Sequence, residues 1–251
     1  MLNHQTAERL REMKLPGMAD GFLAQLQQVE SQAMTFEERF GLLVDQELAY
    51  RHDRRLKRLL SEAKLRQSAC LEDIDYSQPR GLDRALIRTL GTGLWLRTNK
   101  NVLITGPTGV GKTYLACALA NAACRQGFRA KYYRVPRLLS ELAIARADGT
   151  YTRDLAALAR ADLLVLDDWG LTPLNTTEGR EILEVVEDRC LNRSTVIAGQ
   201  LPVDSWHAAI GDPSVADAIL DRLIHNSYHI TLRGESMRRI KNSTAATEDS
   251  Q

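Results

Sequence analysis

The chain has 251 residues, with 33 lysines and arginines against 32 aspartates and glutamates, so its formal net charge is +1. Its 44% hydrophobic and 26% charged residues are typical of a globular protein with a core, which excludes a disordered polyelectrolyte, and the bulk charge indicates no partner. The polar N-terminus lacks the apolar segment of a signal peptide, and no run reaches the roughly 18 to 20 apolar residues of a membrane-spanning helix. We therefore expect a cytoplasmic protein with no membrane partner and, from its four scattered cysteines, neither disulfides nor a zinc site.

The first third of the chain has a helical pattern. Apolar residues recur there at three- and four-residue spacings, as the buried stripe of a helix requires. Breaks fall at Pro16-Gly17 and near Thr35, which forms with Glu38 the capping box of a new helix. We predict a small all-helical N-terminal domain of three or four helices over residues 1–68, for self-association or for contact with a partner or DNA.

The most basic stretch of the chain lies at the end of this domain. Residues 51–66 carry seven basic side chains against Asp53 and Glu62. Two interpretations stay open: a solvated helix face, or a surface that contacts nucleic-acid phosphates, for which several cations must lie on one side.

Beyond residue 95 the pattern changes to strands that alternate with helices. The predicted strands are 101–105, 130–135, 163–167, 195–198 and 228–232, and the predicted helices are 114–125, 136–147, 152–161, 178–191 and 215–220. Since a helix must carry the chain back between parallel neighbours, this order predicts an α/β fold with a parallel sheet sandwiched by helices over residues 95–241. Residues 69–94 are predicted to be a linker and the first helix of this domain, and the polar tail 242–251 is expected to be disordered.

Two helical patterns precede the third predicted strand, where a minimal unit would have one. We therefore predict an inserted helix. It carries Arg146, Arg153 and Arg160, which either solubilise the surface or face DNA.

Residues 106–113 match the pattern G-x-x-x-x-G-K-[ST] between a predicted strand and a predicted helix. Glycines let the backbone amides turn toward phosphate oxygens, and the start of the helix adds its positive end. The Lys112 ammonium then reaches the β and γ phosphates, and the Thr113 hydroxyl binds magnesium. The segment predicts ATP and Mg²⁺ as cofactors, with the linker residues 76–81 as a candidate wall for the adenine. The predicted nucleotide-binding residues are Gly106, Pro107, Thr108, Gly109, Val110, Gly111, Lys112 and Thr113.

A second motif supplies the partner of this loop. Residues 163–168 are Leu-Leu-Val-Leu-Asp-Asp, a buried strand that brings Asp167 to the edge beside the loop, where it would hold magnesium with Thr113. Asp168 would be the base that polarises the attacking water, so the predicted reaction is hydrolysis of ATP to ADP and phosphate. Because aspartate is one methylene shorter than the glutamate often found there, we expect slow turnover.

Two further polar residues follow later elements. Gln200 comes directly after the fourth predicted strand, where its side chain would either orient the water near the γ phosphate or be an ordinary surface amide. Arg222 follows the last predicted helix. It would form a salt bridge with Asp217 or Asp221, or act as a finger that neutralises charge on ATP held by a neighbouring subunit.

The chain resembles the IstB-like ATP-binding proteins, the AAA+ ATPase helpers of bacterial insertion sequences, and more distantly the DnaC helicase loaders. The resemblance covers nearly the whole length. The segments that carry it are 10–18, 106–113, 167–170, 200–202, 221–223 and 234–238.

This resemblance implies an ATP-dependent factor that oligomerises around double-stranded DNA and assists its cognate transposase, with hydrolysis stimulated by DNA or the partner. It also implies that Gln200 is a sensor, Arg222 an arginine finger and Arg238 a second sensor. The chain departs from the AAA+ pattern at Asp168, which replaces the usual glutamate, and in the few residues after Leu232, too few for a full C-terminal helical lid.

Three alternatives stay open from the sequence. A replicative helicase loader would use the same ATPase machinery with a helicase-docking N-terminus. A P-loop kinase would share the phosphate cradle but act as a monomer on a small acceptor. A pure interaction protein would bind ATP without hydrolysing it.

Overall fold

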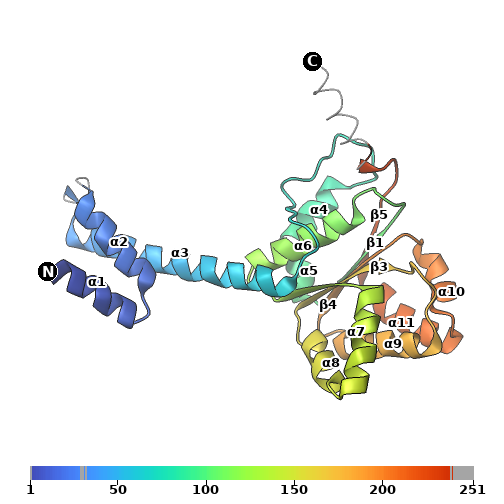
Figure 1. Ribbon diagram of the computed structural model, residues 1–251. Helices are drawn as coiled ribbons and strands as arrows, with labels where there is room; N and C mark the ends of the chain where they lie inside the picture. Colours follow the sequence, from blue (N-terminus) through green and yellow to red (C-terminus); the bar gives the residue numbers. More distant parts are fainter. Residues whose placement is uncertain (1, 29–30, 32, 238, 240–251) are drawn as a thin grey trace. The chain divides into compact units, whose positions relative to one another are not determined.

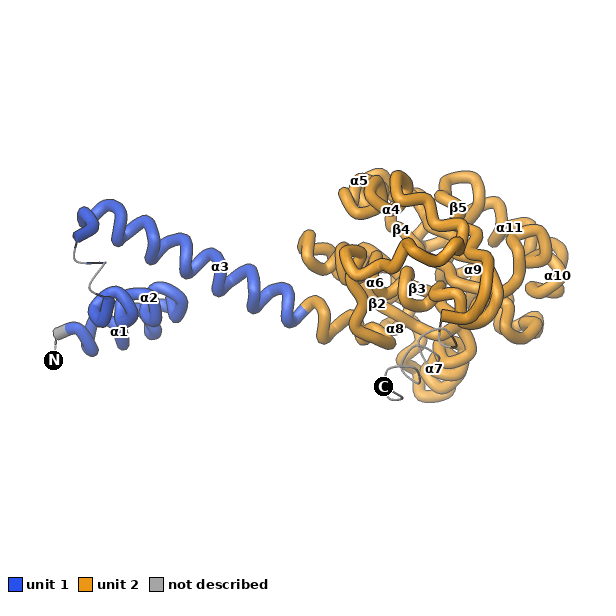
Figure 2. Tube along the Cα trace, turned by 90° about the horizontal axis from the view of Figure 1, so that it is seen from above, with its two compact units in different colours: residues 1–58 blue, residues 59–251 orange. Residues whose placement is uncertain are grey.

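The computed structural model describes residues 2–28, 31, 33–237 and 239, so Arg238 and the tail 242–251 lie outside the described residues. The chain divides into two compact units, Met1–Arg58 and Leu59–Gln251 (Figure 2). The domain boundary expected at residue 68 stays a prediction. Among the described helices, none has the length and apolar character to cross a membrane.

The described part of the N-terminal unit is helical. It contains α1 (Leu2–Glu12), α2 (Pro16–Gln27) and most of α3 (Phe36–Ala63), as far as Arg58. The capping box is present, because Thr35 N donates to Glu38 Oε2 at 2.8 Å and Glu38 N donates to Thr35 Oγ1 at 3.3 Å. The breaks that the sequence indicated therefore separate these helices.

Helix α2 packs closely on α3 at its first turn. A Cβ added to Gly17 would lie 2.8 Å from the carbonyl oxygen of Gln46, so the backbones approach at a distance that only glycine permits. The buried Glu47 accepts a 3.1 Å hydrogen bond from the backbone amide of Met18 and pairs with Arg51 at 2.7 Å. Glu47 thereby satisfies a free amide at the N-terminus of α2.

The second unit contains a five-stranded sheet within its described residues, in the order β2-β3-β4-β1-β5, with every neighbouring pair parallel. This confirms the predicted parallel sheet. The strands are β1 (Asn101–Thr105), β2 (Ala130–Arg134), β3 (Leu163–Trp169), β4 (Ser194–Gly199) and β5 (Ser227–Thr231).

Helices cover both faces of the sheet, with α4, α5 and α6 on one face and α7 to α11 on the other (Figure 1). Two helices, α7 and α8, connect β2 to β3, as the inserted pattern indicated. The helices are α4 (Arg84–Gly91), α5 (Leu94–Arg97), α6 (Lys112–Arg125), α7 (Val135–Asp148), α8 (Tyr151–Ala159), α9 (Thr176–Arg189), α10 (Trp206–Ile210) and α11 (Pro213–Ile224).

The main core lies between the sheet and the second group of helices. Strand residues such as Leu164 and Ile197 pack there against α7, α9 and α11, and the rings of Trp169 and Trp206 lie 5.3 Å apart. The strand order places β4 between β1 and β3. The carboxyl ends of these three strands therefore form one continuous edge, where ligands bind in open α/β sheets.

Candidate nucleotide-binding site

The predicted phosphate-binding loop connects β1 to α6, with Gly111 as the N-cap of α6. Gly106 has a φ of 144°, and a Cβ added there would lie 2.3 Å from the carbonyl oxygen of Leu232. Gly111 has a φ of 104°, and its added Cβ would lie 2.9 Å from Nη1 of Arg80. Both positions require glycine, and the loop brings backbone amides to the positive end of α6.

Lys112 reaches back over the loop. Its ammonium donates hydrogen bonds of 2.7 Å to the carbonyl oxygens of Gly106 and Pro107. Burial lowers the pKa of Lys112, while the charges of Asp167 and Asp168 oppose that shift. The ammonium thus lies against the loop on the side of the two carboxylates, where a phosphate would be its stronger partner.

Asp167 and Thr113 come together as predicted. The Thr113 hydroxyl donates a 2.8 Å hydrogen bond to Asp167 Oδ2, and Asp167 is 1% exposed. A hydroxyl and a carboxylate beside a phosphate-binding loop are the oxygen ligands that Mg²⁺ takes together with nucleotide phosphates. The residues present therefore fit an ATP–magnesium complex.

Tyr132 is a functional candidate that sequence reasoning missed. Its hydroxyl donates a 2.6 Å hydrogen bond to Asp167 Oδ2 from the neighbouring strand β2. Burial, and then the hydrogen bond to Asp167, raise the pKa of Tyr132, so the hydroxyl keeps its proton and stays a donor. Tyr132 orients the carboxylate that faces the metal position.

Asp168 is bound by two arginines that the sequence did not assign to the site. Asp168 has a φ of 58°, an uncommon value for a residue with a side chain, and sits where β3 changes register against β4. Its carboxylate accepts a 2.5 Å hydrogen bond from Arg134 Nε at the end of β2, and Nη1 of Arg66 lies 3.7 Å away. The expected base is therefore held in an ion pair.

A cavity of about 200 Å³ opens beside the loop. Its lining is mostly apolar, with Ile74, Leu82 and Met237 among its walls, and Lys112 and Thr113 at one side. This composition suits a nucleobase at one end and phosphates at the other.

The expected adenine wall, residues 76–81, contributes to this cavity only in part. Arg80 lines it and is 8% exposed, and its Nη1 donates a 3.1 Å hydrogen bond to the carbonyl oxygen of Val110. Tyr76 lies instead under the guanidinium of Arg84, 4.7 Å from its ring centre. The sequence did not indicate that the segment at Met237 contacts the phosphate-binding loop. The backbone amide of Met237 donates a 3.0 Å hydrogen bond to the carbonyl oxygen of Gly109.

The three remaining site candidates have different positions. Gln200 follows β4 at the same edge as the loop and is exposed. Arg222 donates a 2.6 Å hydrogen bond to Glu187. The salt bridge expected with Asp217 or Asp221 is therefore replaced by a pair with Glu187. The carbonyl oxygen of Arg222 accepts a 3.4 Å hydrogen bond from the side chain of Asn101, the first residue of β1. Arg222 therefore lies at the amino edge of the sheet, opposite the phosphate-binding loop of the same chain. Arg238 lies outside the described residues.

The strand order, the loop and the paired Thr113 and Asp167 define a P-loop nucleotide-binding protein of the AAA+ class. Residues 8–246 match the family described as IstB-like ATP binding protein, and the chain belongs to this family. It is similar to an insertion sequence ATP-binding protein of Sinorhizobium fredii, with 50% identity over 95% of this chain and 98% of that protein. It is also similar to the ATP-binding protein of insertion sequence IS1162 from Pseudomonas fluorescens, with 48% identity over 85% of this chain and 93% of the relative.

Solved structures share the fold. DnaI aligns with a TM-score of 0.58 and 22% identity over 70% of this chain and 93% of its own. The DnaC helicase loader aligns with a TM-score of 0.55 and 21% identity over 65% of this chain and 96% of its own.

Proposed function

We propose that this chain is a cytoplasmic, slow ATPase that oligomerises on double-stranded DNA and assists the transposase of its insertion sequence. The observation that carries the proposal is the 2.8 Å hydrogen bond between Thr113 and Asp167 beside a loop built to receive phosphates. The names of the similar insertion-sequence proteins support the role in transposition.

Each candidate residue at the carboxyl edge of the sheet has a role in the proposed hydrolysis. Bound magnesium and ATP supply a polarised γ phosphoryl group. Lys112 neutralises charge on that group, and Thr113 and Asp167 hold the metal. Asp168 accepts the proton of the attacking water, and Gln200 orients that water.

The ion pair at Asp168 supports slow basal turnover. While Arg134 and Arg66 bind the carboxylate, its Oδ2 faces two cations that compete with water for it. DNA or a partner would stimulate hydrolysis by shifting this pairing. Such a shift requires a difference in binding free energy between the paired and the released state.

A neighbouring subunit would complete the site. Arg222 belongs to the sheet edge opposite its own loop, which is compatible with a finger that acts in trans and not in cis. Its ion pair with Glu187 at 2.6 Å would open in the assembled state. We also propose that Arg238 acts as a second sensor, although it lies outside the described residues.

Mixing two inactive variants tests the assembly and the finger together. Lys112→Ala removes the phosphate-binding group, and Arg222→Ala removes the finger. A mixed oligomer contains interfaces where an intact loop meets an intact finger, so we expect ATPase activity to return on mixing. If both single variants are inactive and the mixture stays inactive on DNA, the trans assignment is wrong.

Retention by partner proteins tests the role in transposition. We expect the transposase of the same element, immobilised with duplex DNA, to retain the chain in the presence of ATP and magnesium. A DnaB-type helicase should not retain it. The reverse result would identify a helicase loader.

A further inference from the structure

The basic residues of the inserted helices differ in how they are neutralised. Arg137 pairs with Glu141 at 2.8 Å, and Arg153 pairs with Asp154 at 3.1 Å. Arg146 also has a carboxylate partner, the buried Glu181, and lies over the ring of Tyr151. These residues are occupied within the chain, which favours a structural or solubilising role for them.

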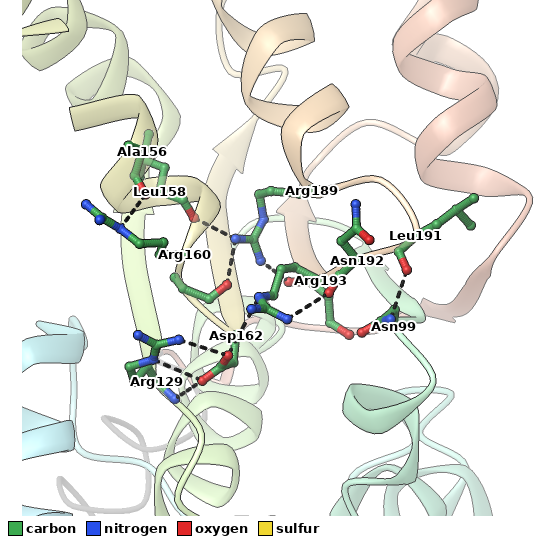
Figure 3. A network of polar contacts seen from close by, with 12 residues as sticks. Asn99, Arg129, Ala156, Leu158, Arg160, Asp162, Arg189, Leu191, Asn192 and Arg193 are labelled. Atoms are coloured by element: carbon green, nitrogen blue, oxygen red, sulfur yellow. Dashed lines mark hydrogen bonds and ion pairs between the residues drawn. The ribbon is translucent and has the colours of Figure 1, made fainter. Parts of the chain in front are cut away.

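Arg160 is different, because within the part of the chain that the structure describes its Nε donates only to a neutral acceptor, the carbonyl oxygen of Ala156 at 3.0 Å. It stands two residues before Asp162, which directly precedes β3 at the amino edge of the sheet, and its side chain points toward Ala156 (Figure 3). Arg129 and Arg193 share one carboxylate, Asp162, at 3.3 Å and 3.7 Å. We call Arg129, Arg160 and Arg193 the arginine edge.

The residues of this edge are held in a row by the sheet. Arg129, Asp162 and Arg193 directly precede β2, β3 and β4. The carbonyl oxygen of Arg129 accepts from Leu163 N at 3.1 Å, and that of Asp162 accepts from Ser194 N at 3.3 Å. Since neighbouring strands lie about 4.8 Å apart, Arg129 and Arg193 are about 10 Å apart along the edge.

A further buried arginine adds positive charge behind this row. Arg189 is 2% exposed, and Figure 3 shows its guanidinium among backbone oxygens. Burial lowers the pKa of Arg189 to about 9, so it still carries its charge at neutral pH. Its hydrogen-bond acceptors are all neutral: Leu158 O, Ala161 O, Ser194 O and Thr195 Oγ1.

Asp162 holds Arg129 and Arg193 in place but does not neutralise the positive charge of the arginine edge. Burial alone would raise the pKa of Asp162, but hydrogen bonds from Arg129 and the charge of Arg193 lower it, so the carboxylate is ionised at neutral pH. This one carboxylate pairs with two guanidinium groups, those of Arg129 and Arg193, and is not paired with Arg160 or Arg189 among the described contacts. The side chains of Arg129 and Arg193 nevertheless remain 54% and 40% exposed, so they are accessible to an external anion.

We propose that Arg129, Arg160 and Arg193 form a contact surface for the phosphate backbone of double-stranded DNA. A DNA strand carries one phosphate per about 3.4 Å of helix axis, so cations spread over about 10 Å can contact more than one phosphate. Guanidinium groups already held by Asp162 lose little freedom on binding. The inference rests on the proposed DNA binding and identifies the surface that performs it.

The test compares two triple variants of the full-length chain. Arg129→Gln/Arg160→Gln/Arg193→Gln removes the arginine edge. The control Arg137→Gln/Arg153→Gln/Arg180→Gln removes the same charge from three other exposed positions, of which Arg180 lies on α9. Affinity for a duplex of random sequence is measured between low and moderate salt, in the presence of ATP and magnesium. We expect the first variant to bind at least tenfold more weakly, with a slope of log affinity against log salt reduced by about 2 to 3, and the control to stay near wild type.

A single variant keeps the test valid if the triple variant fails to fold. Arg160→Gln removes only the bond to Ala156, so the fold should persist and the slope should fall by about 1. Basal ATPase activity of each variant should equal that of wild type, because the arginine edge lies opposite the nucleotide loop.

Other outcomes are distinguishable. If wild type binds DNA and the arginine-edge variants match its affinity and slope, the inference is overturned while the proposed function stands. The same holds if these variants lose retention by the transposase but keep DNA affinity, since the surface would then bind an acidic protein. If wild type itself does not bind duplex DNA, the proposed function fails and the inference fails with it.

Discussion

Arg134 Nε donates a 2.5 Å hydrogen bond to the carboxylate of Asp168, which directly follows the aspartate at the metal position. The two residues come from neighbouring strands, β2 and β3. The hydrogen bond to Asp168 raises the pKa of Arg134, so the guanidinium keeps its charge. The structure thus joins the expected base to a cation that competes with water.

Removing this cation should speed basal hydrolysis. We expect Arg134→Ala to raise kcat without DNA by about three- to tenfold, because one charge-assisted hydrogen bond at a partly exposed site is worth about 1 kcal/mol. Steady-state ATPase assays measure the change. Arg137→Ala, which breaks an exposed pair with Glu141, is the matched control and should leave kcat unchanged. A fall in kcat of Arg134→Ala would show that Arg134 assists the reaction.

Tyr132 should determine how tightly the site holds magnesium. Tyr132→Phe removes the 2.6 Å hydrogen bond to Asp167, so we expect the Mg²⁺ concentration for half-maximal ATPase activity to rise about tenfold. At saturating Mg²⁺, kcat should recover. Tyr133→Phe removes a hydroxyl from the adjacent position and should change neither value. Equal Mg²⁺ dependence of both variants would contradict the role of Tyr132.

Asp168 should be needed for hydrolysis and not for binding. We expect Asp168→Asn to lower kcat by at least about 100-fold, because the amide cannot accept the proton. ATP affinity should be retained, and the assembled state should persist, as light scattering with ATP and DNA would show. Turnover equal to that of wild type would refute the assignment of the base.

The same substitution at two glycines should have opposite effects on the N-terminal unit. Gly17→Ala places a Cβ 2.8 Å from Gln46 O, so we expect a loss of about 1 to 3 kcal/mol despite the better helix propensity of alanine. Gly41→Ala meets no atom within 4 Å and should stabilise α3 by about 0.5 to 1 kcal/mol. Hydrogen exchange of peptides from residues 2–58 measures both, and equal protection would show that α2 does not pack as described.

Local patterns were sufficient to predict much of the site. The loop 106–113 and Asp167 lie in contiguous motifs whose flanking elements were visible as changes of hydrophobic period. The pairing of Thr113 with Asp167 followed from the rule that carboxyl ends of parallel strands share an edge. The parallel sheet and the inserted helix were predictable for the same reason, because helices and strands bury apolar residues with different periods.

Contacts between distant segments could not be predicted in this way. Tyr132 and Arg134 meet the aspartates because β2 is the neighbour of β3, and nothing in the sequence specifies that order. The partner of Arg222 proved to be Glu187, on another helix. This pairing was missed because sequence spacing could offer only the local aspartates as candidates. The short α10 was missed because its 5 residues are too few for a helical period to emerge.

Calorimetric titration of the full-length chain with ATP and magnesium tests the central claim most directly. We expect one nucleotide bound per chain, and no binding heat for Lys112→Ala under the same conditions. Equal binding by the variant, or no binding by wild type, would contradict the assignment of the loop as the nucleotide site.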